Sequence, residues 1–592
     1  MAEPAERVPT AIDALAEEWL GTLLRLEPEL RVTLGRPDPD PGFNDRSPAG
    51  ADETADAARS LLVRLRAAAP ADAVDTVTRA DLIDTLEVTA EQHEAGFWQR
   101  DLKVVASPVQ RMRKVFDLMP TGTDEDWHRV ARRLHRLPEA MAGYRRSLQA
   151  GIAARNTPAL RQVRDVAAQT TQLGAAGGYF TRLTSPARGS VPPALWSDLA
   201  SGARSAAGAY ADLAAFLVRD LAPHAPRHDG VGREHYKIAA RGFFGAGTDL
   251  DDAYAWGCEE LARTVAEQER TAREIKPGAS VEEVAALLDA DPARRLIGTD
   301  ALRAWMQEVS DRTVEELAGT HFDIPWPMRR LECRIAPTSG GGIYYTPPSL
   351  DFTRPGRMWW SVPEGDTVFF PWRELTTVHH EGVPGHHLQC AAAIHHRDRL
   401  KAWRRVSWNV GHGEGWALYA ERLMAELGYL DDPADWLGML DAQRLRAARV
   451  VIDLGVHLGK PKPDGTGTWT GADAFAFLAE HVTMSDAFVR LEATRYLGWP
   501  AQAASYKIGQ RLWESLRDDY TAAGRGDPRT FHREALALGP VRWIFAGPER
   551  LARHLAALPK CPQETTLRAL RRLAMHRTRR PGLIHEDPPD RP

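Results

Sequence analysis

The sequence predicts a mainly α-helical protein with two lobes and one small β-sheet. From about residue 10 to residue 325 the chain is rich in Ala, Leu, Arg and Glu, with apolar residues at helical spacing. Segments typical of strands gather between residues 331 and 370. At 592 residues the chain is too long for one ordinary core. We therefore expect a helical lobe over residues 1–330 and a second lobe over residues 331–592.

Loops between the helices of the first lobe are predicted where Pro, Gly and Asp cluster. Three such clusters fall at residues 36–50, 184–193 and 222–233. None of them has the length of a flexible linker, so the first lobe should be continuous. Near the other end of the chain, the Arg-rich stretch from Arg568 to Arg580 predicts a terminal helix with a solvated face.

Three short segments predict the β-sheet. Leu331–Ile335 and Gly342–Thr346 flank a Ser-Gly-Gly-Gly turn, and Thr367–Phe370 follows after several prolines. Their aromatic and β-branched residues suit a half-buried pleated surface. Because these segments directly precede the His-rich helix described next, we expect the sheet to lie beside that helix.

The region from residue 379 to residue 389 is His-His-Glu-Gly-Val-Pro-Gly-His-His-Leu-Gln, which indicates a metal site. Four of the chain's 20 histidines fall within nine positions. In the zinc peptidase signature H-E-x-x-H, two histidines one turn apart bind the ion and the glutamate acts on water. Here Pro384 stands where the second histidine is usual, so the motif is the variant H-E-x-x-P-G-H-H.

The spacing of the histidines requires a distorted helix. Six residues of regular helix rise about 9 Å and turn His386 off the face of His380, so both could not reach one ion. Pro384 removes a backbone donor and Gly385 adds freedom, which predicts that these two residues loop out of the helix. His386 then becomes the second ligand. The reverse assignment, with His387 as the ligand, stays open.

The third ligand is expected in the segment from residue 411 to residue 421, because a catalytic zinc usually has three protein ligands. This segment looks helical from Trp416 onward. Glu414 lies between two glycines that allow close backbone approach, and it is the predicted ligand, with His412 as its rival. Glu421, two turns further on, could orient a ligand histidine or bind substrate; the alternative is a solvated carboxylate.

Three ordered motifs resemble the bacterial family called domain of unknown function 885 (DUF885). They are H-E-x-x-P-G-H-H, then E-G-W-A-L-Y-A-E, then the stretch from Arg495 to Gly509. The resemblance is clearest over residues 330–545. That family is similar to largely helical, gluzincin-like zinc peptidases such as angiotensin-converting enzyme and thimet oligopeptidase. The resemblance implies a helical metallohydrolase with a deep cleft, and it supplies no substrate.

The same resemblance implies roles for later residues. The stretch from Arg495 to Gly509 offers Tyr496 and Tyr506 as donors, and Tyr506 is the one expected to stabilise the oxyanion, as a tyrosine from a late helix does in related peptidases. His457 is a second candidate, with Asp453 one turn before it to hold the imidazole; otherwise His457 is a satisfied core histidine. Arg495 offers a cation to a substrate carboxylate.

In zinc peptidases a strand along the cleft pairs with the extended substrate. By that analogy Tyr344 and Tyr345 contact the substrate. The alternative is an aromatic pair on a small sheet.

Together these expectations describe a zinc-dependent hydrolase, a metallopeptidase that acts on small peptides. One Zn²⁺ per chain, held by His380, His386 and Glu414, would lower the pKa of a bound water to roughly 7, and Glu381 would take its proton. The same site could instead cleave a small non-peptide amide or ester. A further alternative is a catalytically inactive helical binding protein, against which the intact Glu381 argues.

Composition limits the partners and the location. The charged fraction of 26% and the hydrophobic fraction of 43% are typical of a soluble globular protein. The net charge of −5 argues against a nucleic-acid partner. The four cysteines form no C-x-x-C pair, and the first residues show no signal-peptide pattern. We therefore expect a cytoplasmic protein without a membrane partner, whose substrate is a peptide or a small amide.

Overall fold

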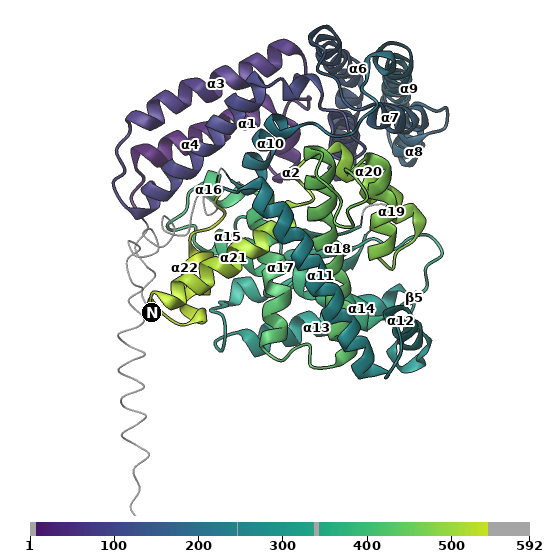
Figure 1. The fold of residues 1–592 in the computed structure, drawn as a ribbon. Helices are drawn as coiled ribbons and strands as arrows, with labels where there is room; N and C mark the ends of the chain where they lie inside the picture. Colours follow the sequence, from purple (N-terminus) through teal and green to yellow (C-terminus); the bar gives the residue numbers. More distant parts are fainter. Residues whose placement is uncertain (1–6, 246, 337–341, 543–592) are drawn as a thin grey trace, which may run out of the picture.

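The computed structural model describes residues 7–245, 247–336 and 342–542. Within these residues the protein is mainly helical with little sheet, as predicted (Figure 1). No helix among them is long and apolar enough to cross a membrane. The predicted terminal helix around Arg568–Arg580 and most of the Ser-Gly-Gly-Gly turn lie outside the described residues.

The first part of the chain forms the helices at the top of Figure 1. Several of them begin at a side-chain cap: Thr10 and Thr123 each bond the backbone three residues on, which replaces a hydrogen bond that the first helical turn lacks. Each predicted loop separates two α-helices. The helices are α1 (Ala11–Leu26), α2 (Glu29–Thr33), α3 (Pro48–Ala67), α4 (Ala73–Glu94), α5 (Pro108–Lys114), α6 (Asp124–Ala154), α7 (Leu160–Leu173), α8 (Tyr179–Thr184) and α9 (Pro193–Phe216).

The later helices enclose the His-rich region. Helix α17 packs along α21, and α18 packs along both α11 and α14. The helices are α10 (Arg233–Phe244), α11 (Leu250–Ile275), α12 (Val281–Ala290), α13 (Thr299–Leu317), α14 (Pro371–Glu381), α15 (His386–His395), α16 (Ala402–Val406), α17 (Val410–Glu426), α18 (Pro433–Leu458), α19 (Gly471–His481), α20 (Asp486–Gly498), α21 (Ser505–Ala522) and α22 (Pro528–Ala537).

The main sheet has three strands in the order β2-β4-β3. The strands are β2 (Leu331–Ile335), β3 (Ile343–Thr346) and β4 (Gly356–Trp360); β2 runs parallel to β4, and β3 antiparallel. The predicted strands at β2 and β3 are confirmed, but they do not pair, because the unpredicted β4 lies between them. The third predicted segment forms β5 (Val368–Phe369), which pairs with β1 (Leu296–Ile297) in a separate ribbon.

The hydrophobic core crosses the lobe boundary predicted at residue 330. One cluster joins Val77 of α4 and Val314 of α13 to Trp416 of α17. Another buries Trp403 of α16 among residues of α1, α3 and α4. The boundary itself stays a prediction. Elements from both sides of it therefore support the helices that carry the motif.

Candidate metal centre

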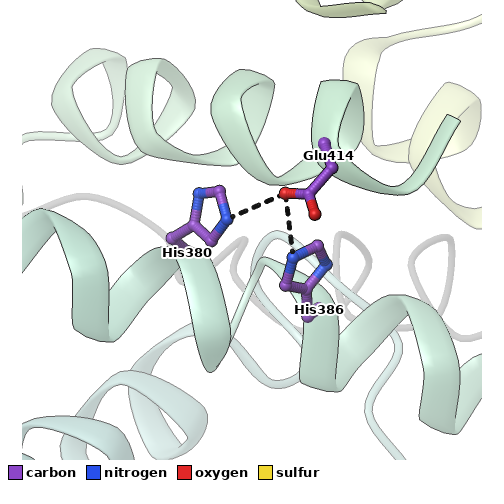
Figure 2. A group of neighbouring side chains, drawn as sticks. All are labelled: His380, His386 and Glu414. Carbon is purple, nitrogen blue, oxygen red and sulfur yellow. Dashed lines mark ion pairs between the residues drawn. The ribbon is translucent and has the colours of Figure 1, made fainter. Parts of the chain in front are cut away.

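Three helix termini bring His380, His386 and Glu414 together, as Figure 2 shows. His380 lies at the end of α14, His386 at the start of α15, and Glu414 near the start of α17. Oε2 of Glu414 lies 3.4 Å from Nε2 of His380 and 3.5 Å from Nε2 of His386. The candidate ligand atoms all lie within 4.8 Å of one another.

The two distances from Glu414 match those expected around one divalent cation. A tetrahedral ion with bonds of about 2.1 Å holds its ligand atoms about 3.4 Å apart. Two imidazole nitrogens and one carboxylate oxygen suit zinc, and they discriminate weakly against manganese or cobalt. Within the described parts of the chain, this is the one group of histidine, cysteine or carboxylate side chains that meets the spacing of a metal site.

The spacing problem is solved by a break between two helices, and not by a bulge within one. Helix α14 ends at Glu381 and α15 begins at His386, with a turn of four residues between them. A Cβ at Gly385 would lie 2.0 Å from the carbonyl oxygen of His380, so only glycine fits there. The carbonyl of Pro384 accepts a hydrogen bond of 2.8 Å from the Trp416 indole, which ties α17 to this turn.

His387 points away from the candidate ligands. Its Nε2 donates to the carbonyl of Met328 at 2.8 Å, which leaves Nδ1 to accept from the Tyr345 hydroxyl at 2.9 Å. Burial lowers the pKa of His387 to about 4, so the ring is neutral, as this pair of bonds requires. A Cβ at Gly356 of β4 would lie 2.5 Å from that Nδ1. The geometry therefore favours His386 over His387 as the second ligand.

Glu421 is buried, with a side chain only 1% exposed, so the solvated alternative is wrong. Its Oε1 accepts from Nδ1 of His380 at 2.7 Å, and its Oε2 accepts from Thr376 at 3.0 Å and Gln443 at 3.2 Å. Burial alone would raise the pKa of Glu421, but the hydrogen bond from His380 and nearby positive charge lower it. Glu421 therefore holds the His380 ring with its Nε2 toward Glu414, the usual support of a metal-binding histidine.

Glu381 lies next to His380 and is buried. Its Oε2 has no hydrogen-bond partner among the described residues, which is unusual for a buried carboxylate. Burial raises the pKa of Glu381, and the charges of His386 and His380 oppose that rise. Arg446 of α18, which sequence reasoning missed, also acts electrostatically on both Glu381 and Glu421. Glu381 thus has an acceptor atom available beside the ligand cluster.

Tyr506, at the start of α21, lies near the cluster. Burial raises the pKa of its hydroxyl, and the charge of Glu414 raises it further, so the proton stays on the oxygen. The Arg449 guanidinium stands 4.8 Å from the centre of the Tyr506 ring. Arg495, expected to meet a substrate carboxylate, instead donates to Glu492 at 2.9 Å, so its charge is already paired.

His457 is a core histidine. Its Nε2 donates to the carbonyl of Tyr496 at 3.0 Å, and its side chain is fully buried. Asp453 does not hold it, because Nε2 of His457 and Oδ1 of Asp453 are 3.7 Å apart. Oδ2 of Asp453 accepts instead from the Tyr236 hydroxyl at 2.6 Å and the Ala501 N–H at 2.9 Å. These bonds fix α18 to its neighbours. The oxyanion role of His457 stays a prediction, with its Nε2 already engaged by a backbone carbonyl.

The two tyrosines of β3 have different surroundings. Tyr345 bonds His387, whereas Tyr344 is 39% exposed and stacks on Trp359 with ring centres 6.1 Å apart. Trp408, which carries no spacing signal in the sequence, is 44% exposed, and its ring centre lies 5.6 Å from that of His386. An exposed aromatic ring therefore adjoins a candidate ligand.

Helix α17 begins earlier than predicted, at Val410, because Asn409 caps it by accepting from the N–H of His412. Nδ1 of His412 lies 3.2 Å from Nε2 of Gln389, outside the cluster, so the rival ligand is placed elsewhere. A Cβ at Gly415 would lie 2.4 Å from the backbone of Gly509. The two glycines thus let α17, with Glu414, approach α21, with Tyr506.

Two solved structures share this fold. One, from Colwellia psychrerythraea, has a TM-score of 0.78 at 20% identity and covers 92% of this chain and 98% of its own. The other, from Shewanella oneidensis, has a TM-score of 0.70 at 17% identity and covers 91% of this chain and 99% of its own. Each is titled a "putative lipoprotein", the second "of unknown function". A comparison with curated protein sequences finds no match.

The three motifs that the structure brings to one place therefore belong to a fold shared with other bacterial proteins. Residues 28–542 match the family described as "Bacterial protein of unknown function (DUF885)". That match spans most of the described chain, including His380, His386 and Glu414. The chain belongs to the DUF885 family.

Proposed function

We propose that this protein is a zinc-dependent hydrolase that cleaves the peptide bonds of small peptides, with one Zn²⁺ per chain. The main support for this proposal is that His380, His386 and Glu414 lie close together. The buried Glu381 beside them has a carboxylate oxygen without a hydrogen-bond partner. Bound there, zinc would act as a Lewis acid on the substrate carbonyl and lower the pKa of water. The deep cleft implied by the family resemblance is part of this proposal.

The chain's own groups supply the proton transfers and the oxyanion donor. Glu381 accepts a proton from the attacking water at its free Oε2 and passes it to the leaving amine. Tyr506 keeps its proton, because burial and Glu414 raise its pKa, and so it can donate to the developing oxyanion. One such donor typically contributes about 3 kcal/mol to transition-state stabilisation.

Two features favour a peptide over a small non-peptide amide or ester. Among the described residues, β3 pairs only with β4, so its outer edge is available to an extended backbone. Tyr345 joins this strand to His387, the neighbour of His386. Trp408 adds an exposed apolar ring beside His386 for a substrate side chain. If the protein were an inactive binding protein, the buried Glu381 oxygen without a hydrogen-bond partner would have no functional explanation.

Metal content tests the first part of the proposal. Mass spectrometry of wild-type protein and of His380→Ala, His386→Ala, Glu414→Ala and His387→Ala should find about one zinc per wild-type chain. The first three variants should lose it, and His387→Ala should keep it, because both nitrogens of His387 are engaged elsewhere. Circular dichroism checks that each variant folds. No stoichiometric metal after reconstitution would overturn the proposal.

Digestion of a peptide library tests the second part. Wild-type protein should cleave short peptides, and Glu381→Gln should keep its zinc and lose the activity. A zinc-loaded enzyme that cleaves small amides or esters but no peptide would support the alternative substrate class. The predicted cytoplasmic location is also part of the proposal, and the titles of the two structural neighbours point elsewhere. Cell fractionation decides it.

A further inference from the structure

A cavity lies apart from the candidate metal ligands. This cavity, of about 510 Å³, is bounded by the end of α6, the segment 223–231 and Arg100. Its volume falls within the range of small-molecule sites, roughly 300 to 1,000 Å³. Four basic side chains line it, and no Asp or Glu does; they are Arg100, Arg155, His224 and His228. The nearby Asp229 is engaged by Arg161 at 3.0 Å.

Arg100 is half-buried without a carboxylate partner. Its Nη1 donates a hydrogen bond of 3.4 Å to Oδ1 of Asn156, and the guanidinium forms no ion pair with any described carboxylate. Burial lowers its pKa, and no acidic group offsets that effect. Elsewhere in the protein, Arg133 pairs with Asp38 and Arg449 with Glu492, both at 2.8 Å. Burying a charged guanidinium without a counter-charge costs free energy, and a bound anion would offset that cost.

The wall around Arg100 is held in place by its own hydrogen bonds. Nδ2 of Asn156 donates to the carbonyl of Gly96 and to Oε1 of Gln99, both at 2.9 Å, which turns Oδ1 toward Arg100. Thr157 donates to the carbonyl of His224 at 3.1 Å. The site is thus arranged before a ligand arrives, which reduces the ordering cost of binding.

The local charge balance favours an anion. The end of α6 contributes the equivalent of about half a negative charge. Arg155 ends that helix in the left-handed conformation, with φ of 55°, and the N–H groups of Arg155 and Asn156 cap the last carbonyls. The positive charges of Arg100 and Arg155 exceed the half charge of the helix end. Guanidinium groups also match the planar oxygen pairs of carboxylate and phosphate.

We propose that this cavity binds a small molecule through an oxyanion, either phosphate or carboxylate, held by Arg100 and Arg155 with His224 and His228 as further donors. The site is independent of the metal centre, since none of its lining residues belongs to that cluster. The inference therefore stands whether or not the protein is a hydrolase.

Isothermal titration calorimetry on the full-length protein tests the site, with inorganic phosphate and succinate as separate probes at constant ionic strength. Wild-type protein should bind at least one of them saturably, and the tighter one identifies the chemistry. Arg100→Gln should weaken that binding at least tenfold, and Arg100→Lys should restore only part of it, because the charge returns but the planar pair of donors does not. Arg155→Gln should weaken binding as well. It removes an exposed side chain, so folding is not at risk.

Two controls separate specific binding from other effects. Arg219→Gln removes an arginine with a 74% exposed side chain that does not line the cavity, and it should bind like wild type. His380→Ala removes a candidate metal ligand and should also leave this binding unchanged. Equal affinity in wild type and Arg100→Gln, or no saturable binding of either probe, would overturn the proposal. Loss of binding in His380→Ala would place the anion at the metal centre instead.

Discussion

Among single residues, Tyr506 allows the sharpest test of the proposed chemistry. Its hydroxyl is buried near Glu414 and is kept protonated. In Tyr506→Phe, turnover of a cleaved peptide should fall about 100- to 1,000-fold, while zinc content stays the same. The loss should appear in kcat more than in KM, because the donor acts on charge that develops in the transition state. Steady-state kinetics and mass spectrometry measure both quantities.

Tyr496→Phe is the matched control for that test. Tyr496 is a fully buried tyrosine whose hydroxyl donates to Glu492 at 2.6 Å and accepts from Arg449 at 2.9 Å. Its loss should reduce stability and leave the zinc-loaded turnover nearly unchanged. Equal loss of turnover in the two variants, or none in Tyr506→Phe, contradicts the donor role.

The residues of the candidate site were predictable to different degrees. His380, Glu381 and Glu414 stand in motifs whose spacing in the chain carries the information. The choice between His386 and His387 depended on the carbonyl of Met328 and the hydroxyl of Tyr345, which are distant in sequence. The hydrogen-bond partner of His457 could not be predicted, because it is the backbone carbonyl of Tyr496, which no sequence pattern specifies.

Between elements, the contact of α17 with α21 controls the separation of Glu414 and Tyr506. In Gly415→Ala, the new Cβ would lie 2.4 Å from the backbone of Gly509, and backbone cannot rotate away as a side chain can. We expect a loss of roughly 1 to 3 kcal/mol in the free energy of unfolding, with weaker zinc binding. Denaturant unfolding and metal titration measure the two effects.

Gly208→Ala is the control for that prediction. Gly208 lies in the exposed face of α9, and a Cβ there meets nothing within 4 Å. Alanine should stabilise the protein by up to about 1 kcal/mol, because it favours helix. If both alanine variants are equally stable, α17 and α21 are less tightly packed than the structure shows.

The ion pair between Arg449 of α18 and Glu492 of α20 should make the free energy of unfolding depend on pH. Burial alone would raise the pKa of Glu492, but the charges of Arg449 and Arg495 lower it to about 2, from an ordinary value of 4.5. The pair's contribution is therefore complete above pH 4.5 and is lost as the pH falls toward 2. Between pH 7 and pH 3 the free energy of unfolding of the wild-type protein should therefore fall by about 2 kcal/mol more than that of Glu492→Gln, which lacks the titrating carboxylate. Urea unfolding of both proteins from pH 7 to pH 3 tests this; a constant difference between them contradicts it.

Elements were predictable where their pattern is local. The loops between the early helices and the strands β2 and β3 follow from short-range composition. Strand β4 was missed because its segment follows a proline-rich stretch, and its place between β2 and β3 is set by long-range pairing. The start of α17 was missed because the glycines around Glu414 disfavour helix, and the Asn409 cap with the packing against α21 outweighs that preference.

For the molecule as a whole, the shared core predicts that the two halves do not fold separately. A fragment of residues 331–542 would expose the surface of Trp403 that α1, α3 and α4 cover, and that of Trp416, near which Val77 and Val314 pack. We expect it to bind a hydrophobic dye and to unfold without a cooperative transition. Calorimetry on the fragment and on the full chain decides this. A cooperative fragment would support the division predicted at residue 330.

The short length of β3 affects how readily two copies of the protein could pair through their strand edges. A strand edge that accepts a passing peptide will also accept the edge of another chain, which is how many sheets begin to aggregate. Strand β3 has only four residues, and Pro347 and Pro348 follow it. Four residues suffice to orient one short guest, and the prolines, which lack an N–H, stop the ladder from extending. The proposed binding of a peptide to β3 is therefore compatible with little edge-to-edge pairing between copies of the protein.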